Sequence, residues 1–271
     1  MTQQLKKSAT RSEIAVSSEN RAIAARKMVE RLIANGEPVA LFLDVDGTLL
    51  DVALTPSTVH VPAYLPKLLD EIAERLHGAL AIVTGRPLEE VDRLLHPAKF
   101  VAAGVHGGQM RLSDKGKIET LTPSFNPELV MDLKKIVEDL PGVVYEDKGS
   151  GIALHYRLAP ELQSSLLMLL ETLVPKYPTE FSICEGRKVV EVLPVGFSKG
   201  RALRKLATLP AFANKIPVMV GDDIADVDAF RAAEDLGGFG LKVAGENFSE
   251  SESSFYGPSE VLDWLQKIAN I

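Results

Sequence analysis

The chain has 271 residues, 46% of them hydrophobic, which is enough to bury one large core or a core with a smaller domain inserted into it. Lys and Arg number 30 against 37 Asp and Glu, and the resulting net charge of -7 argues against a nucleic acid partner. The only cysteine is Cys184, which excludes an internal disulfide and a multi-cysteine zinc site.

The beginning of the chain is polar. Residues 1–20 contain no apolar run of the kind that a signal peptide needs, and no window of the sequence approaches the roughly 18 apolar residues of a membrane span. Together with the single cysteine, these features predict a soluble protein of the reducing cytoplasm with no membrane partner. We expect a monomer.

The first half of the chain predicts a helix and then a strand–helix–strand unit. Residues 1–36 form a polar segment and one helix, because apolar residues recur near helical spacing before a stop at Gly36: Ile23, Met28, Val29, Leu32 and Ile33. Residues 39–43 are a continuous apolar run, typical of a strand buried on both faces of a parallel sheet. A helical stripe over residues 65–76 and a second apolar run at 80–83 complete the unit.

The middle of the chain has a different pattern. Residues 121–194 predict a helix followed by alternating strands around Tyr145 and Tyr156, then a second helix and strands around Ile183 and Val190. This is a helix-strand-strand unit used twice, and alternating strands leave one sheet face open to meet a ligand. A helix near residues 202–206 and an apolar strand at 217–220 then return to the earlier pattern.

The predicted fold class is therefore α/β with two parts. Residues 37–120 and 195–271 build a Rossmann-like core around a parallel sheet, and residues 121–194 form an inserted α/β cap domain.

Two carboxylates, Asp44 and Asp46, follow the strand at 39–43 directly. Because side chains alternate along an extended chain, both can point the same way at the carboxyl end of the sheet, where ligands bind in open α/β folds. One of them can attack phosphorus to give an aspartyl phosphate, while the other donates a proton to the leaving oxygen and later activates water. A polar strand end followed by a turn is the alternative explanation.

The tripeptide Thr84-Gly85-Arg86 follows the second buried strand. A hydroxyl and backbone N–H groups thus meet the same sheet edge at the start of a helix, where they can bind phosphate. Taken alone, the tripeptide equally fits a helix start, with Pro87 at the helix entry and Glu89 and Glu90 in the first turn.

Later segments supply a cation and further carboxylates. Lys199, at the start of a helix, can neutralise the nucleophilic carboxylate and the phosphate, although a lone lysine also fits a solvated surface. Gly221-Asp222-Asp223, with Asp226 following, closes another apolar strand. Clustered carboxylates beside a phosphate indicate Mg²⁺ rather than zinc, because Mg²⁺ prefers hard oxygen ligands. Helix N-capping would explain one of these acids.

Taken in order, these elements resemble the four motifs of the haloacid dehalogenase superfamily of phosphatases, over about residues 38–243: Asp44-Val-Asp-Gly-Thr48, Thr84, Lys199 and Gly221-Asp-Asp-Ile-Ala-Asp226. The resemblance implies a haloacid dehalogenase core in which Asp44 is the nucleophile and Asp46 the acid/base. It also implies a Mg²⁺ site at Asp44, Asp46 through its backbone carbonyl, and Asp222, with Asp223 or Asp226 in support.

Three further segments resemble the trehalose-6-phosphate phosphatase family within that superfamily: Gly104-Val-His-Gly107, Glu146-Asp-Lys-Gly149 continuing to Ala153-Leu-His-Tyr-Arg157, and Gly186-Arg-Lys-Val-Val-Glu191 leading to Gly196-Phe-Ser-Lys-Gly200. The resemblance implies that cap residues grip a disaccharide, and the matching positions are Glu146, Lys148, Arg157, Arg187 and Glu191. Strand alternation agrees, because it gathers these residues into polar rows suited to sugar hydroxyls. A solvated cap surface is the alternative without the resemblance.

The remaining candidate substrate-binding residues are Gly85, Arg86 and His106, the last of which equally fits a structural histidine. The sequence departs from the family at Gln109, Ala225 and Val227, which affects the finer metal and substrate contacts rather than any catalytic group.

The resemblance implies Mg²⁺-dependent hydrolysis of trehalose 6-phosphate to trehalose and inorganic phosphate, a step of trehalose biosynthesis, with a small-molecule sugar phosphate as the only partner. Two alternatives remain open. A related enzyme acting on another sugar phosphate, including a phosphomutase, would share the core and differ in the cap. A catalytically silent sugar-phosphate sensor would bind without releasing phosphate, although it would gain little from a paired nucleophile and acid/base.

Overall fold

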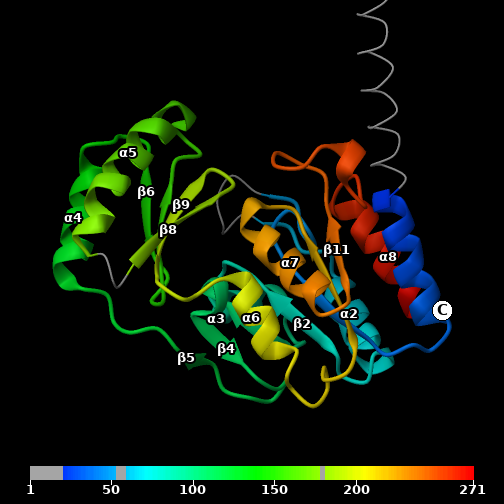
Figure 1. Ribbon diagram of the computed structural model, residues 1–271. Helices are drawn as coiled ribbons and strands as arrows, with labels where there is room; N and C mark the ends of the chain where they lie inside the picture. Colours follow the sequence, from blue (N-terminus) through cyan, green and yellow to red (C-terminus); the bar gives the residue numbers. More distant parts are fainter. Residues whose placement is uncertain (1–20, 53–58, 178–180) are drawn as a thin grey trace, which may run out of the picture.

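The computed structural model describes residues 21–52, 59–177 and 181–271, so the prediction for the polar stretch 1–20 lies outside the described residues. The chain forms two sheets, and each has its own hydrophobic core. Figure 1 shows them side by side, with the smaller sheet and its helices at the left.

The larger sheet contains seven strands. In spatial order they are β11 (Phe239–Lys242), β10 (Ile216–Gly221), β1 (Val39–Leu43), β2 (Leu80–Val83), β3 (Val101–Gly104), β4 (Gln109–Arg111) and β5 (Glu119–Thr120). The first five pair in parallel, which confirms the predicted parallel-sheet core, and β4 and β5 extend it in antiparallel pairing.

Helices cover this sheet on both faces, as the continuous burial of the central strands requires. They are a helix through residues 21–34, α2 (Leu65–Arg75), α3 (Leu88–Leu94), α6 (Lys199–Leu206), α7 (Val227–Asp235) and α8 (Pro258–Asn270). Helix α6 packs on α7, and α2 packs on α8. Leu65, Leu69 and Ile72 form the fully buried stripe of α2 that the sequence predicts.

The helix through residues 21–34 belongs to this packed unit. It lies beside α8 (Figure 1), where Arg26 pairs with Glu260 at 2.5 Å and Lys267 with Glu30 at 2.5 Å. The predicted N-terminal helix is thereby confirmed over the described residues. No helix in the described ranges is both long enough and apolar enough to span a bilayer.

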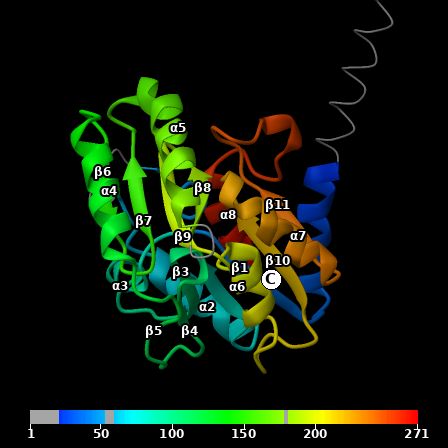
Figure 2. The same cartoon turned by 60° about the vertical axis from the view of Figure 1, so that its left-hand side comes forward.

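The smaller sheet is built from the predicted helix-strand-strand unit used twice. The elements are α4 (Pro127–Glu138), β6 (Val144–Asp147), β7 (Ile152–His155), α5 (Gln163–Leu173), β8 (Phe181–Gly186) and β9 (Val189–Pro194). The strands are antiparallel in the order β6-β7-β9-β8. Leu133 of α4 and Leu166 of α5 pack with Leu154 and Val190 in one core, so the helices cover one face of the sheet (Figure 2).

Short 3-10 helices link several of these elements: η2 (Val105–Gly107), η3 (Pro160–Leu162), η4 (Val174–Lys176), η5 (Ile224–Asp226) and η6 (Glu250–Glu252). The strand order β10-β1-β2 has the main consequence for the site. Because these strands are parallel neighbours, the residues that follow them, Asp222, Asp44 and Thr84, meet at one edge of the sheet.

Candidate active site

Strand β1 brings Asp44 to this sheet edge. The N–H of Asp44 donates to the carbonyl of Val220 at 3.0 Å, which continues the ladder with β10, and the residue is only 3% exposed. The chain then turns at Gly47, where φ is +79°. A Cβ atom at Gly47 would lie 2.1 Å from Oδ2 of Asp222, so a glycine is required for the turn to approach Asp222 this closely.

Lys199, the first residue of α6, joins two of the carboxylates. Its Nζ donates to Oδ1 of Asp44 and to Oδ1 of Asp226, both at 2.7 Å. Burial disfavours the ammonium form, but the carboxylates of Asp226 and Asp44 outweigh burial and hold the pKa of Lys199 well above its ordinary value. Lys199 is therefore a fixed positive charge beside Asp44.

Asp44, Asp222 and Asp226 form a buried cluster, with one oxygen from each within 4.8 Å of the others. Burial, reinforced by the charges of Asp226 and Asp223, raises the pKa of Asp222 to about 8. Burial also raises the pKa of Asp44, although Lys199 opposes the shift. Oδ1 of Asp222 has no hydrogen-bond partner among the residues that the structure describes. These residues fit Mg²⁺, because a divalent cation would satisfy that oxygen and offset the repulsion.

The neighbouring aspartates differ in their surroundings. Oδ2 of Asp226 accepts from the N–H groups of Asp222 at 3.2 Å and Asp223 at 3.0 Å. The carboxylate of Asp223 accepts instead from the N–H of Arg187 at 3.0 Å and from Nδ2 of Asn247 at 2.8 Å. The structure thus brings Asp226, rather than Asp223, together with Asp44 and Asp222. Metal ligation by Asp44, Asp46, Asp222 and Asp223 stays a prediction.

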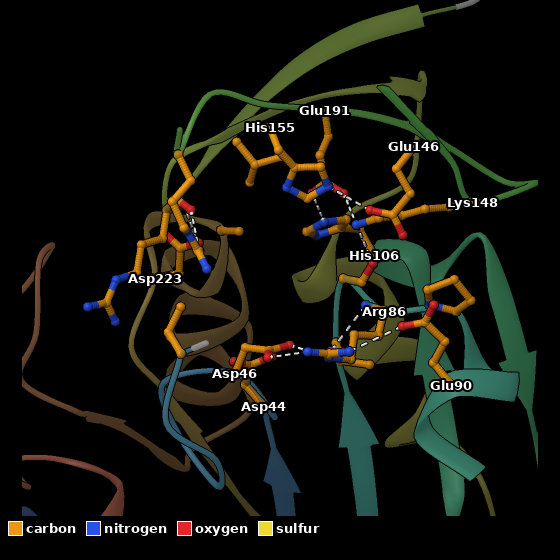
Figure 3. Close-up of a pocket in the computed structure, with 18 of the residues that line it drawn as sticks. Asp44, Asp46, Arg86, Glu90, His106, Glu146, Lys148, His155, Glu191 and Asp223 are labelled. Atoms are coloured by element: carbon orange, nitrogen blue, oxygen red, sulfur yellow. Dashed lines mark hydrogen bonds and ion pairs between the residues drawn. The ribbon is translucent and has the colours of Figure 1, made fainter. Parts of the chain in front are cut away.

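Arg86, in the segment that follows β2, binds Asp46 from the segment that follows β1. Thr84 is buried, and its Oγ1 accepts from the N–H of Arg86 at 3.2 Å. Arg86 donates through Nε and Nη2 to the two oxygens of Asp46, both at 2.6 Å, and through Nη1 to Glu90 at 3.2 Å (Figure 3). Arg86 therefore binds Asp46, whose side chain is 33% exposed, through a planar bidentate contact.

A second polar network connects the smaller sheet to the sheet edge. Lys148 donates through Nζ to Oε1 of Glu191 at 2.6 Å and to the carbonyl of Gly85 at 3.0 Å, while the other Glu191 oxygen contacts Nε2 of His106 (Figure 3). Burial disfavours the ionised form of Glu191, but His106 and Lys148 outweigh burial and hold its pKa well below the usual range. Glu191 is therefore an anion within a closed network.

Strand pairing aligns the remaining polar residues. Glu146 and Glu191 both face Ala153 across the sheet, so they lie in one row on the same face. Oε2 of Glu146 contacts Nε2 of His155 at 2.6 Å. Nη2 of Arg157 donates to the carbonyl of Arg187 at 3.3 Å, which ties the segment after β7 to the β8–β9 turn.

A cavity of about 200 Å³ lies between the two sheets, and residues of the predicted site from both parts of the chain line it. Figure 3 shows the core groups Asp44, Asp46 and Arg86 on one side of it and Glu146, Lys148, His155 and Glu191 on the other. Apart from Asp226, all residues of the predicted site line this cavity: Asp44, Asp46, Thr84, Gly85, Arg86, His106, Glu146, Lys148, Arg157, Arg187, Glu191, Lys199, Asp222 and Asp223.

Comparisons with known proteins identify the family. The model of the trehalose-phosphatase family matches residues 42–262. A probable trehalose-phosphate phosphatase of Sinorhizobium fredii is 41% identical over 205 residues, covering 75% of this chain and 77% of the relative. The chain belongs to the trehalose-phosphatase family. The trehalose-6-phosphate phosphatase of Escherichia coli is 34% identical over 230 residues, covering 84% of this chain and 86% of the relative.

Solved structures support the fold of a trehalose-phosphatase. The C-terminal domain of the trehalose-6-phosphate phosphatase of C. albicans matches with a TM-score of 0.78 at 20% identity, covering 91% of this chain and 97% of that one. A phosphatase of the haloalkanoate (HAD) superfamily from Bacteroides thetaiotaomicron matches with a TM-score of 0.58 at 14% identity, covering 87% and 96%. The predicted fold class is confirmed. The family match confirms the prediction that the chain is a phosphatase enzyme.

Some residues of the cavity were not predicted as site residues. Glu90, which holds Arg86, and His155, which contacts Glu146, both line it. Glu90, in the first turn of α3, follows Arg86 by four residues, which is close enough in sequence for a contact. The apolar wall of Val144, Leu158 and Val189 left no signal in the sequence, because each also fits an ordinary strand or turn position.

Proposed function

We propose that this trehalose-phosphatase hydrolyses trehalose 6-phosphate to trehalose and inorganic phosphate, with Asp44 as covalent nucleophile and Mg²⁺ as cofactor. The observation that carries the proposal is a cavity lined by two kinds of chemical group. It is lined on the core side by groups suited to phosphoryl transfer and on the other side by groups suited to sugar hydroxyls. The proposed substrate follows from the activity named for the similar proteins of Sinorhizobium fredii and Escherichia coli.

In the first step, the Asp44 carboxylate attacks phosphorus, and the bond from phosphorus to the sugar oxygen breaks. Protonated Asp46 donates its proton to the leaving sugar oxygen. To reach that oxygen, the Asp46 carboxyl must give up at least one of its two hydrogen bonds from Arg86. Lys199 and Thr84 hold the phosphate, and Lys199 keeps the attacking carboxylate in place.

In the second step, Asp46 accepts a proton from water, and that water attacks the phosphorus of the aspartyl phosphate. The bond to Asp44 breaks, inorganic phosphate leaves and the Asp44 carboxylate is restored. When bound, Mg²⁺ held by Asp44 and Asp222 would neutralise charge on the phosphoryl group. Fixed positive charge from Lys199 acts in the same direction.

The proposal assigns residues 37–120 and 195–271 to a catalytic core and residues 121–194 to a cap that selects the substrate. Separate hydrophobic cores in the two parts support this division. In the cap, Glu146, Lys148, Arg157, Arg187 and Glu191 would bind the disaccharide, with His106 and Gly85 beside them. Their present mutual contacts leave them positioned for exchange with sugar hydroxyls.

The same proposal includes a monomeric enzyme that works in the cytoplasm. The single cysteine, Cys184, supports a reducing compartment, since the enzyme needs no disulfide.

Phosphate release from a set of sugar phosphates tests the proposal. Trehalose 6-phosphate would be compared with glucose 6-phosphate, sucrose 6-phosphate and mannose 6-phosphate, each with Mg²⁺ and with EDTA. A strong Mg²⁺-dependent preference for trehalose 6-phosphate is expected. A preference for another sugar phosphate would retain the core chemistry and refute the assigned substrate, and tight binding without phosphate release would favour a sensor.

A further inference from the structure

The tip of the β8–β9 hairpin, residues 186–188, lies against a loop of the core. The N–H of Arg187 donates to Oδ2 of Asp223 at 3.0 Å, and Nδ2 of Asn247 donates to Oδ1 of the same carboxylate at 2.8 Å. A Cβ at Gly186 would lie 3.1 Å from Asp223, so the tip packs closely. Asp223 thus ties the hairpin to the loop that follows β11.

Glu246, in that same loop, pairs with both cations of the tip. Its Oε1 lies 2.8 Å from Nζ of Lys188, and its Oε2 accepts from Nε of Arg187 at 3.3 Å. The hydrogen bond from Lys188, together with the charge of Arg187, holds the pKa of Glu246 below its ordinary value. Glu246 is therefore an anion at neutral pH, and it connects the core to the hairpin that carries Arg187 and Glu191.

The guanidinium of Arg187 contacts two carboxylates. Its Nη1 is 3.5 Å from Oδ2 of Asp222, and its Nε is 3.3 Å from Oε2 of Glu246. A cation bound at Asp222 would compete for that carboxylate and repel the guanidinium. Glu246 is then the acidic partner that keeps Arg187 at the cavity, which Arg187 lines and Glu246 does not.

We infer that Glu246 is a positioning residue for substrate binding: it holds Arg187 at the cavity and fixes the hairpin tip on the core. The inference rests on the proposed function, because Arg187 is one of the residues assigned to the disaccharide. Glu246 itself is 40% exposed, and paired surface charges have modest strength. The expected effect is therefore a KM raised by about three- to tenfold rather than a loss of chemistry.

The test replaces Glu246 by glutamine, which keeps the size and removes the charge. Kinetics would be measured with trehalose 6-phosphate and with p-nitrophenyl phosphate, which is too small to need the cap. For Glu246→Gln we expect a raised KM for trehalose 6-phosphate, kcat within about twofold, and unchanged kcat/KM for p-nitrophenyl phosphate. Glu250→Gln is the matched control, because the Glu250 carboxylate makes no contact with the hairpin in the described ranges.

Hydrogen exchange at residues 186–188 supplies a second measurement that does not depend on activity. Glu246→Gln should speed exchange of these amides at least about threefold, while Glu250→Gln should match the wild type. Unchanged exchange together with an unchanged KM would overturn the inference. Equal losses with both phosphate esters would also overturn it, because the effect would then be on the chemistry. If the wild type does not hydrolyse trehalose 6-phosphate, the proposed function fails, while hydrogen exchange still tests the role of Glu246.

Discussion

The buried carboxylates Asp44, Asp222 and Asp226 would repel one another if no cation lay between them. Lys199 reduces that repulsion by pairing with Asp44 and Asp226, and Arg187 lies 3.5 Å from Asp222. Fixed charges of this kind need little reorganisation when a phosphate arrives, because their geometry is set by the fold. At the scale of the residue, the proposed binding of a phosphate and a cation would therefore need little movement of these charged groups.

Gly47 makes this arrangement possible, and its replacement tests the packing. In Gly47→Ala, the new Cβ would lie 2.1 Å from Oδ2 of Asp222, so the turn or the carboxylate must move. Misplacement of about 1 Å is expected to lower kcat by about 100-fold. The measurement is kcat together with the melting temperature.

Gly36→Ala is the control, because φ there is +75° and a Cβ would have no neighbour within 4 Å. An alanine in this left-handed backbone conformation should lower the free energy of unfolding by only about 1–2 kcal/mol, and the variant should keep full activity. If Gly47→Ala kept wild-type kcat, close approach of the turn to Asp222 would be unimportant for the reaction.

At the scale of the element, the open face of the β6-β7-β9-β8 sheet holds a polar network that reaches the core. Nζ of Lys148 donates a hydrogen bond to the carboxylate of Glu191 in β9 and another to the carbonyl of Gly85, which follows β2. The side chains of Lys148 and Glu191 are only 9% and 6% exposed, so removing the charge of one leaves the other nearly buried without its main counter-charge.

Glu191→Gln should accordingly lower the free energy of unfolding by on the order of 3 kcal/mol at pH 7. The pKa of Glu191 is depressed in the folded protein, so its contribution is fully present above the unfolded value of about 4.3 and is lost as pH falls through the folded value. The difference in melting temperature between wild type and variant should be constant from pH 8 to pH 6 and shrink below about pH 4.3.

Glu185→Gln, an exposed change on the neighbouring strand β8, should leave the melting temperature within about 1 °C of the wild type. A difference for Glu191→Gln that grew on acidification would contradict the assigned ion pair.

Sequence alone could predict the elements that repeat a strong pattern. Strands β1, β2 and β10 are continuous apolar runs, and each is followed by a polar residue of the site, at Asp44, Thr84 and Asp222. Strands β4 and β5 were not predicted, because strands of 3 and 2 residues are too short to show a period.

Contacts between side chains were less predictable than the elements. Arg86 grips Asp46 across 40 positions of sequence, and Asn247 reaches Asp223 across 24. No local spacing encodes such pairs, because the fold alone brings them together. The motifs placed Asp46 and Asp223 at the site, but the direction of their carboxylates depends on these distant partners.

At the scale of the whole molecule, the cavity lies between two parts that have separate hydrophobic cores. Polar contacts cross between them, from Lys148 to Gly85 and from Arg187 to Asp223. A substrate of disaccharide size must displace some of these contacts, so we expect the cap to open and close during turnover.

Mg²⁺ should stabilise the whole molecule, because it would bind the folded carboxylate cluster and not the unfolded chain. A free Mg²⁺ concentration of 100 times its dissociation constant would raise the free energy of unfolding by about 2.7 kcal/mol. The melting temperature would then be higher with Mg²⁺ than in EDTA. Asp222→Asn should remove this response. It should also raise the melting temperature in EDTA at pH 9, where the Asp222 carboxyl, with a pKa of about 8, is largely ionised and buried beside Asp226 and Asp223.

Asp235→Asn removes an exposed carboxylate that pairs with Arg204, and it should keep the full response to Mg²⁺. An equal response in Asp222→Asn and in the wild type would place the cation elsewhere.

The most direct test of the account is the initial rate of phosphate release from trehalose 6-phosphate, with Mg²⁺ present, by the wild type and by Asp44→Asn. The account predicts rapid release by the wild type and a rate lower by at least about 1,000-fold in the variant, because the amide cannot attack phosphorus. Near-normal turnover by Asp44→Asn, or no phosphate release by the wild type, would contradict it.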